Sequence, residues 1–239
     1  HINCCNANGP RAFMMVPGFA VTGAPDEIFI NLYGQGDVLI PVNSTNKVSL
    51  KQVSDYPVSD KIEFRINPEK PESFTISFRI PSWSKNSVIE VNGTEIPEIT
   101  PGTYKQITRL WNKNDRVLLK LDLSARLIRQ NGYQAILRGP IVLARDTRFN
   151  DGFVYESAVI SEKKGAVDLV PASRKPANIW MAFTAPLSLG TDLEGEFREP
   201  KQISFCDFAS AGNTWGEDSR YKVWISQTLN VMGADYEKY

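Results

Sequence analysis

Hydrophobic and polar residues alternate along most of the chain after residue 26. The alternation is clearest at residues 61–67 and 73–80, where Ile and Phe occupy one face and charged or hydroxyl side chains occupy the other. A period of two residues predicts β-strands with one buried face and one wet face. Turn-forming residues separate the runs, and the Asn92-Gly93 pair favours a tight hairpin. This pattern favours an antiparallel sandwich over a βαβ fold.

The one helical pattern lies near the start of the chain, at residues 9–22. Pro10 suits the first turn of a helix, and Pro17-Gly18 is typical of a stop. After Arg11 the segment is apolar on nearly every side, so a helix here needs cover all around. We therefore predict one short helix that the following chain does not cover by itself.

The predicted fold is all-β, with two antiparallel β-sandwich domains after the short helix. A length of 239 residues corresponds to between one and two domains. The connections become looser beyond residue 125, with a Lys-Lys-Gly joint and a long polar stretch at 190–200. We predict a helical segment at 1–23, a first β-sandwich at 24–124 and a second β domain at 125–239.

Charge and hydropathy exclude two classes of partner. The chain has 27 Lys and Arg against 27 Asp and Glu, which gives a formal net charge of +0. No summed positive field is present to attract nucleic acid or anionic lipid. No apolar run approaches the roughly 18 residues that span a bilayer. We expect no nucleic-acid partner and no membrane partner.

The adjacent thiols Cys4 and Cys5 are the strongest candidate for chemistry. Consecutive Cα atoms lie about 3.8 Å apart, whereas an unstrained disulfide needs roughly 4.4–6.8 Å. Two thiolates that bind a soft cation such as zinc would supply half of a tetrahedral site. Two small buried side chains are the alternative interpretation. His1, the only histidine, is a third possible ligand, although a lone terminal histidine is more often incidental.

The tryptophans and the third cysteine are interpreted mainly as packing residues. Four of the five tryptophans lie in strand-like or strand-end contexts that favour packing in the core or at a sheet edge. Trp215 follows a Gly-Asn-Thr sequence and is the best candidate for an exposed ring that stacks on a sugar. Cys206 ends an apolar run and is expected to be a buried thiol. The tryptophans are Trp83, Trp111, Trp180, Trp215 and Trp224.

Residues 4–11 resemble the vicinal-cysteine motif of glycoside hydrolase family 127, the β-L-arabinofuranosidase group. Further segments are similar to the β-sandwich portion of the same proteins, and they follow in order along essentially the whole chain. These segments are residues 31–33, 54–57, 79–83, 91–93, 209–215 and 219–224.

The resemblance implies a set of roles for the cysteine pair. Cys4 would be the catalytic nucleophile and a zinc ligand, and Cys5 would be a second zinc ligand. A thiolate would attack the anomeric carbon of a β-L-arabinofuranoside of plant-type glycans, and water would resolve the thioglycosyl intermediate with retention. The acid/base glutamate and the other zinc ligands, a glutamate and a cysteine two residues apart, would lie in an α-helical barrel before the pair. The helix at 9–22 would be a remnant of that barrel.

The chain begins at His1 without an initiator methionine, so we expect a piece of a longer protein that lacks the acid/base half. Alone, it is expected to be inactive and to hold zinc weakly or not at all. The parent would reach its carbohydrate substrate through the missing barrel, and would be exported or periplasmic if it acts on external glycans. The alternative is a non-catalytic β-sandwich module that binds carbohydrate or braces a partner domain.

Overall fold

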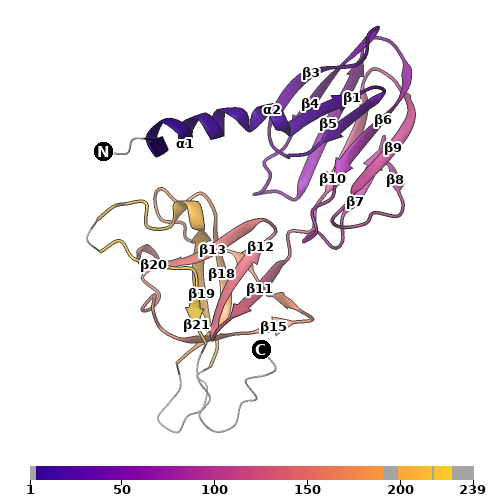
Figure 1. Ribbon diagram of the computed structural model, residues 1–239. Coiled ribbons are helices and arrows are strands. Elements are labelled where there is room, and N and C mark those ends of the chain that lie inside the picture. The colour runs from indigo at the N-terminus through magenta and orange to yellow at the C-terminus, as the bar shows by residue number, and fades with distance from the viewer. Residues whose placement is uncertain (1–3, 191–198, 217, 228–239) are drawn as a thin grey trace. The chain divides into compact units, whose positions relative to one another are not determined.

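The computed structural model describes residues 4–190, 199–216 and 218–227 (Figure 1). The chain divides into two compact units between Asp122 and Leu123, and each unit is described by itself. No helix in these described ranges is long and apolar enough to cross a membrane.

The chain starts with two helical segments, α1 (Cys4–Met15) and α2 (Pro17–Ala20). A short helical start is therefore confirmed, but the predicted bounds of 9–22 are wrong. Pro10 lies inside α1 instead of in its first turn, and α1 stops before Pro17, whose ring nitrogen has no hydrogen to donate. Residues 21–24 are a strand because Val21 pairs with Ile30 across an antiparallel ladder.

Two sheets form the first unit, and both are antiparallel except for one pair. In the smaller sheet β2 (Glu27–Ile30) runs parallel to β6 (Glu72–Arg79), with Ile28 opposite Ile76. Its order is β1 (Val21–Ala24), β2 (Glu27–Ile30), β6 (Glu72–Arg79) and β9 (Tyr104–Trp111). The order of the larger sheet is β3 (Gly36–Asn43), β4 (Asn46–Val53), β5 (Lys61–Pro68), β10 (Asp115–Lys120), β7 (Val88–Val91) and β8 (Thr94–Ile96).

A single hydrophobic core joins the two sheets of this unit. Ile62, Phe64 and Ile66 alternate along β5 and are fully buried, as the period of two predicted. Phe64 contacts Phe78 of β6 edge-on, with ring centroids 5.1 Å apart. Because Phe64 and Phe78 belong to different sheets, their contact lies across the interior of a sandwich.

The second unit is built on one long antiparallel path of strands. The strands of the path are, in order, β14 (Ala158–Ile160), β18 (Ala182–Leu189), β19 (Lys201–Asp207), β13 (Ile141–Asp146), β12 (Tyr133–Arg138), β11 (Ala125–Gln130), β16 (Ala166–Val167) and β15 (Glu162–Lys163). Three more strands pair with members of the path: β17 (Val170–Pro171), β20 (Tyr221–Lys222) and β21 (Ile225–Ser226). β13 changes partner along its length: Val142 pairs with β12, whereas Leu143 pairs with β19. β13 therefore connects the ladder that contains β12 to the ladder that contains β19. The predicted all-β class with a helical start is confirmed.

The strands of the second unit are short at both ends of the path. Two 3₁₀ turns, Thr147–Phe149 and Phe208–Ser210, follow β13 and β19 directly.

Candidate functional site

The two sequence-predicted thiols lie in the first turn of α1, and both are exposed. Their Sγ atoms are 3.9 Å apart. Two sulfurs held about 2.3 Å from a zinc ion at the tetrahedral angle would be separated by about 3.8 Å. Cys4 and Cys5 therefore fit one edge of a zinc-thiolate tetrahedron. The alternative of two buried thiols is wrong.

The described residues do not complete the ligand set of a zinc ion. Among the described residues, no group of three or more His, Cys, Asp or Glu side chains is placed to hold a metal ion. His1, the third candidate ligand, lies outside the described residues. The described part of the chain thus offers two thiolates to a metal that takes four ligands in a closed site.

Uncovered apolar side chains lie at the C-terminal end of α1 and on α2. Phe13 and Met14 have exposed fractions of 79 % and 82 %, and Met15 of α1 and Phe19 of α2 are also exposed. The all-round apolar character predicted a helix that the following chain does not cover alone, and the exposure of these side chains confirms it. Large adjacent apolar side chains in solvent are typical of a surface that another part of a protein covers.

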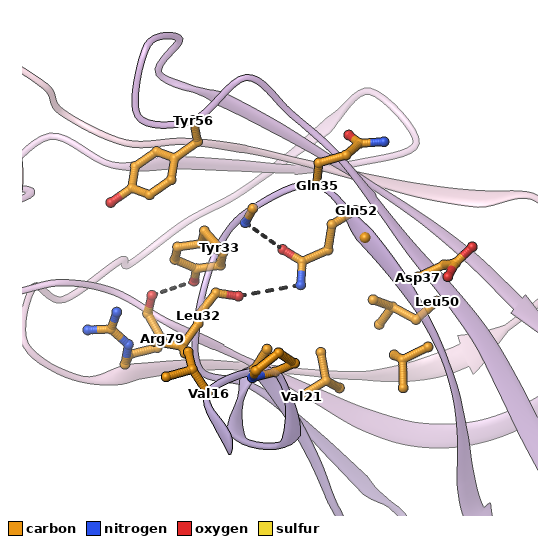
Figure 2. A pocket seen from close by; sticks show the side chains of 15 residues that line it. Val16, Val21, Leu32, Tyr33, Gln35, Asp37, Leu50, Gln52, Tyr56 and Arg79 are labelled. Atoms are coloured by element: carbon orange, nitrogen blue, oxygen red, sulfur yellow. Dashed lines mark hydrogen bonds between the residues drawn. The ribbon is translucent and has the colours of Figure 1, made fainter. Parts of the chain in front are cut away.

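A cavity of about 550 Å³ opens in the first unit where the helical start joins the sandwich (Figure 2). Val16 and Ala20 form its helical side, and Tyr33, Tyr56 and Arg79 line it from the sandwich. Three segments that carry the family resemblance, residues 31–33, 54–57 and 79–83, therefore meet at one place. Sequence reasoning did not predict the cavity.

Hydrogen bonds fix the wall of this cavity. The buried Gln52 side chain donates to the carbonyl of Leu32 and accepts from the backbone N–H of Gly34, each over 3.4 Å. The Tyr33 hydroxyl donates to the backbone carbonyl of Arg79, as the dashed line in Figure 2 shows. The Arg79 Nε donates in turn to the carbonyl of Asn31 at 2.5 Å. The loop after β2 is thereby held against β6.

The two tyrosines of the cavity are neutral hydrogen-bonding groups. Burial raises the pKa of Tyr56 to about 12, against the opposing effect of the positive Arg79. Burial likewise raises the pKa of Tyr33 above its ordinary value. Both phenols keep their protons at neutral pH, so these side chains suit binding and not proton abstraction.

The cavity and the thiol pair are separate sites. Cys4 begins α1, whereas Val16 follows its last residue, and a helix of 12 residues is about 18 Å long. The structure therefore does not bring the cavity residues to the candidate nucleophile.

The third cysteine and the tryptophans differ in how far they are buried. Cys206 is buried, as predicted, and burial raises the pKa of its thiol to about 12. Trp111 is fully buried, Trp83 packs partly buried against the same core, and Trp215 is 91 % exposed, in agreement with the sequence. Packing was the wrong prediction for two rings at strand ends, Trp180 and Trp224, whose exposed fractions are 51 % and 40 %.

The architecture defines a β-sandwich module with a helical start that carries a vicinal thiol pair. Residues 27–123 match the family model described as the GH127 middle domain of β-L-arabinofuranosidases. The resemblance to glycoside hydrolase family 127 is thereby confirmed. No match was found among curated proteins.

Solved structures show the same fold over nearly the whole chain. The chain aligns over 94 % of its length with Ara127N-Se, a GH127 β-L-arabinofuranosidase from Geobacillus stearothermophilus T6, at 20 % identity and a TM-score of 0.77. It aligns over 94 % of its length with the GH127 β-arabinofuranosidase BT3674, at 22 % identity and a TM-score of 0.75. It spans only 37 % and 38 % of those two chains, respectively.

Proposed function

We propose that this chain is part of a retaining zinc-thiolate glycoside hydrolase that acts on β-L-arabinofuranosides of plant-type glycans. The observation that carries the proposal is the exposed Cys4–Cys5 pair, whose sulfurs are 3.9 Å apart on the helix just before the matched middle domain. Two solved proteins of the same fold are arabinofuranosidases, which supports the substrate class.

In this proposal Cys4 is the nucleophile. Its Sγ forms a bond to the anomeric carbon while the glycosidic C–O bond breaks, and the leaving oxygen takes a proton from an acid outside the described residues. The group that gave its proton then takes one from water, the water oxygen attacks the same carbon, and the C–S bond breaks to release the Cys4 thiolate, so two inversions give net retention. A zinc ion bound to Cys4 and Cys5 would keep both sulfurs as thiolates.

The uncovered face of α1 supports a helical domain beyond this chain. Phe13 and Met14 would pack against that domain, which would supply the acid/base glutamate, the remaining zinc ligands and the sugar pocket. The carbohydrate partner would therefore be bound mainly by the added domain, with Cys4 presented to it from the start of α1.

Replacing Cys4 by serine tests the proposal in a protein that joins this chain to the helical domain. Hydrolysis of an aryl β-L-arabinofuranoside should fall by at least about 100-fold, because an alcohol is a far weaker nucleophile than a thiolate. The Cys206→Ser variant is the matched control and should keep its activity, since this thiol is buried in the second unit. Equal activity of wild type and Cys4→Ser would refute the assigned nucleophile.

The 239-residue chain alone should retain well under one zinc ion after dialysis. Two thiolates do not complete a zinc site, and ordering the helix start around the ion costs about 1–2 kcal/mol of backbone entropy per residue. Elemental analysis gives the metal content, with Cys4→Ser as the comparison. One tightly held zinc per chain, lost in that variant, would show that the ligand set is complete within these residues.

The second candidate function is non-catalytic: carbohydrate binding or bracing of a neighbouring domain. The cavity in Figure 2 favours it, because its neutral tyrosines and fixed backbone suit binding without proton transfer. An extended protein that binds arabinofuranosides without turnover would favour this candidate over the hydrolase.

A further inference from the structure

Exposed aromatic rings and one lysine form a cluster on the second unit. The Lys222 ammonium lies over the ring of Tyr155, 5.3 Å from its centroid, and over the ring of Tyr133 at 5.8 Å. Phe153 contacts Tyr155 edge-on, with ring centroids 5.3 Å apart. Tyr133 and Tyr155 are each 43 % exposed, and Phe153 is 61 % exposed. Three segments that are distant in sequence thus form one surface, the Lys222 surface.

Strand pairing fixes two sides of the Lys222 surface. Lys222 of β20 lies opposite Arg145 of β13, and Tyr133 of β12 lies opposite Ser226 of β21. Directly opposed residues of an antiparallel pair place their side chains on the same face, so the lysine and Arg145 share one face. A short connection joins Lys222 to Ser226, and both of its ends are paired. The backbone beneath the lysine and beneath Tyr133 is therefore held in place before any ligand binds.

The loop that carries Phe153 and Tyr155 is fixed from inside the unit. Val154, between the two rings, is 2 % exposed. The Arg145 Nη1 donates to the carbonyl of Phe153 at 2.8 Å, and the backbone N–H of Glu156 donates to the same carbonyl at 3.0 Å. A buried side chain and two hydrogen bonds therefore hold the segment that presents the rings. Groups that are ordered in advance lose less conformational entropy when a ligand binds.

The ammonium of Lys222 has N–H donors to offer to a ligand. The acidic groups of the loop act on Arg145, which is 1 % exposed: burial lowers the pKa of Arg145, and the charges of Asp151 and Glu156 oppose that effect. Within residues 4–190, 199–216 and 218–227, no carboxylate forms an ion pair with Lys222 and no atom accepts a hydrogen bond from its ammonium. An ammonium carries three donors and a full positive charge. The Lys222 surface therefore combines an unpaired charge with three exposed rings.

We propose that the Lys222 surface binds uronate residues of acidic glycans, independently of the hydrolytic site proposed above. A uronate carries a carboxylate on a sugar ring whose C–H face is apolar. The exposed ring of Phe153 suits stacking with that C–H face, and the Lys222 ammonium suits a charge-assisted hydrogen bond to the carboxylate. Phe153 and the ammonium each lie 5.3 Å from the Tyr155 ring, so neighbouring sugars of one glycan chain can contact both. A carboxylate on a peptide side chain would pair with the lysine but has no ring face for the aromatic side chains.

Isothermal titration calorimetry of the 239-residue chain tests this proposal with matched acidic and neutral probes. The probes are an oligogalacturonate, an oligoglucuronate and the methyl ester of each, which keeps the sugar rings and removes the charge. At low salt, wild type should bind at least one acidic oligomer about fivefold more tightly than its ester, because only the acid pairs with the ammonium. Added salt should reduce this preference, since it screens an exposed ion pair.

Three variants separate the contribution of the charge from that of the ring. Lys222→Met keeps most of the aliphatic stem and removes the charge, so it should bind acid and ester equally. Lys222→Arg keeps the charge and should retain the preference for the acid. Phe153→Ala should weaken the binding of acid and ester alike, by about fivefold to tenfold, because the stacking surface is lost.

The matched controls are Lys163→Met and Trp215→Ala, which change an exposed lysine and an exposed ring of the same unit that do not belong to the Lys222 surface. Both should bind like wild type, which excludes general charge attraction and aromatic adsorption. Cys4→Ser should also bind like wild type, so failure of the hydrolase proposal leaves this one standing. The proposal is overturned if wild type binds neither acidic oligomer, binds acid and ester equally, or keeps its preference in Lys222→Met. Polyglutamate bound as tightly as the acidic oligomers would assign the surface to a protein partner and overturn it too.

Discussion

Replacing Asp146 by alanine is expected to lower the free energy of unfolding by about 3–5 kcal/mol, because the change strands a partly buried guanidinium. The Asp146 carboxylate is 1 % exposed and accepts four hydrogen bonds. Three come from Arg148, through its backbone N–H at 3.0 Å, its Nε at 2.8 Å and its Nη2 at 2.7 Å. The fourth comes from Gly212. Alanine would remove this acceptor from the Arg148 backbone N–H, its Nε and the Gly212 N–H, whereas Nη2 would keep the Ser210 carbonyl at 2.6 Å.

Urea denaturation of Asp146→Ala, Arg148→Ala and the double variant measures the effect. The double variant should be less destabilised than the sum of the two single variants, because it buries no unpaired charge. Additive losses, or a single-variant loss below about 1 kcal/mol, would contradict the assigned network. The controls Thr214→Ala and Ser219→Ala change the same loop without touching Asp146 and should cost little.

The contribution of the Asp146 carboxylate to stability can also be measured through the pH dependence of the free energy of unfolding. Burial by itself raises the pKa of Asp146, but the hydrogen bonds from Arg148 and Gly212 outweigh burial and hold the pKa below its ordinary value of 3.8. A lowered pKa in the folded state means that the carboxylate stabilises the fold at neutral pH. That contribution is lost as the pH falls below about 4 toward the folded-state pKa. Asp146→Asn should flatten this part of the stability profile.

The strands were predictable because buried and exposed side chains alternate along them with a period of two residues. Residues 61–67 alternate between Ile or Phe and polar side chains, and the structure buries Ile62, Phe64 and Ile66. The helix bounds were not predictable to the same degree. Pro10 fits a first turn by its fixed φ, yet α1 already begins at Cys4, so local preference was overridden there.

The thiol pair was found from sequence because two adjacent cysteines are chemically unusual. The cavity and the network around Asp146 were missed because their members are distant in sequence: Tyr33 and Arg79 in one case, Asp146 and Gly212 in the other. An Asp-x-Arg sequence is too common to signal a buried ion pair. One usable signal was present, since three segments that resemble the family meet at the cavity.

Exposure of aromatic residues was predictable only where turn chemistry surrounded them. Trp215 follows Gly-Asn-Thr, and its exposure was anticipated. Trp180 and Trp224 lie in apolar runs that predict burial, but each falls just outside a strand. Hydrophobicity alone does not distinguish the last paired residue of a strand from the first unpaired one.

Replacing Trp111 by alanine is expected to lower the free energy of unfolding by about 3–5 kcal/mol. Trp111 ends β9, is fully buried and donates its indole N–H to the carbonyl of Phe74 at 3.0 Å. Its ring lies against Phe74, with centroids 6.0 Å apart, and the guanidinium of Arg109 lies over it at 5.2 Å. Alanine would remove these contacts and leave a cavity between the sheets.

The neighbouring Leu110 provides the matched control, because it lies on the same strand and is exposed. Leu110→Ala should change the free energy of unfolding by less than about 0.5 kcal/mol, since no core volume is lost. Trp111→Phe keeps most of the ring but loses the indole N–H, so its destabilisation should lie between the two. Guanidinium denaturation followed by circular dichroism ranks the three variants. If Trp111→Ala and Leu110→Ala unfold at the same midpoint, the core of the first unit does not depend on this ring.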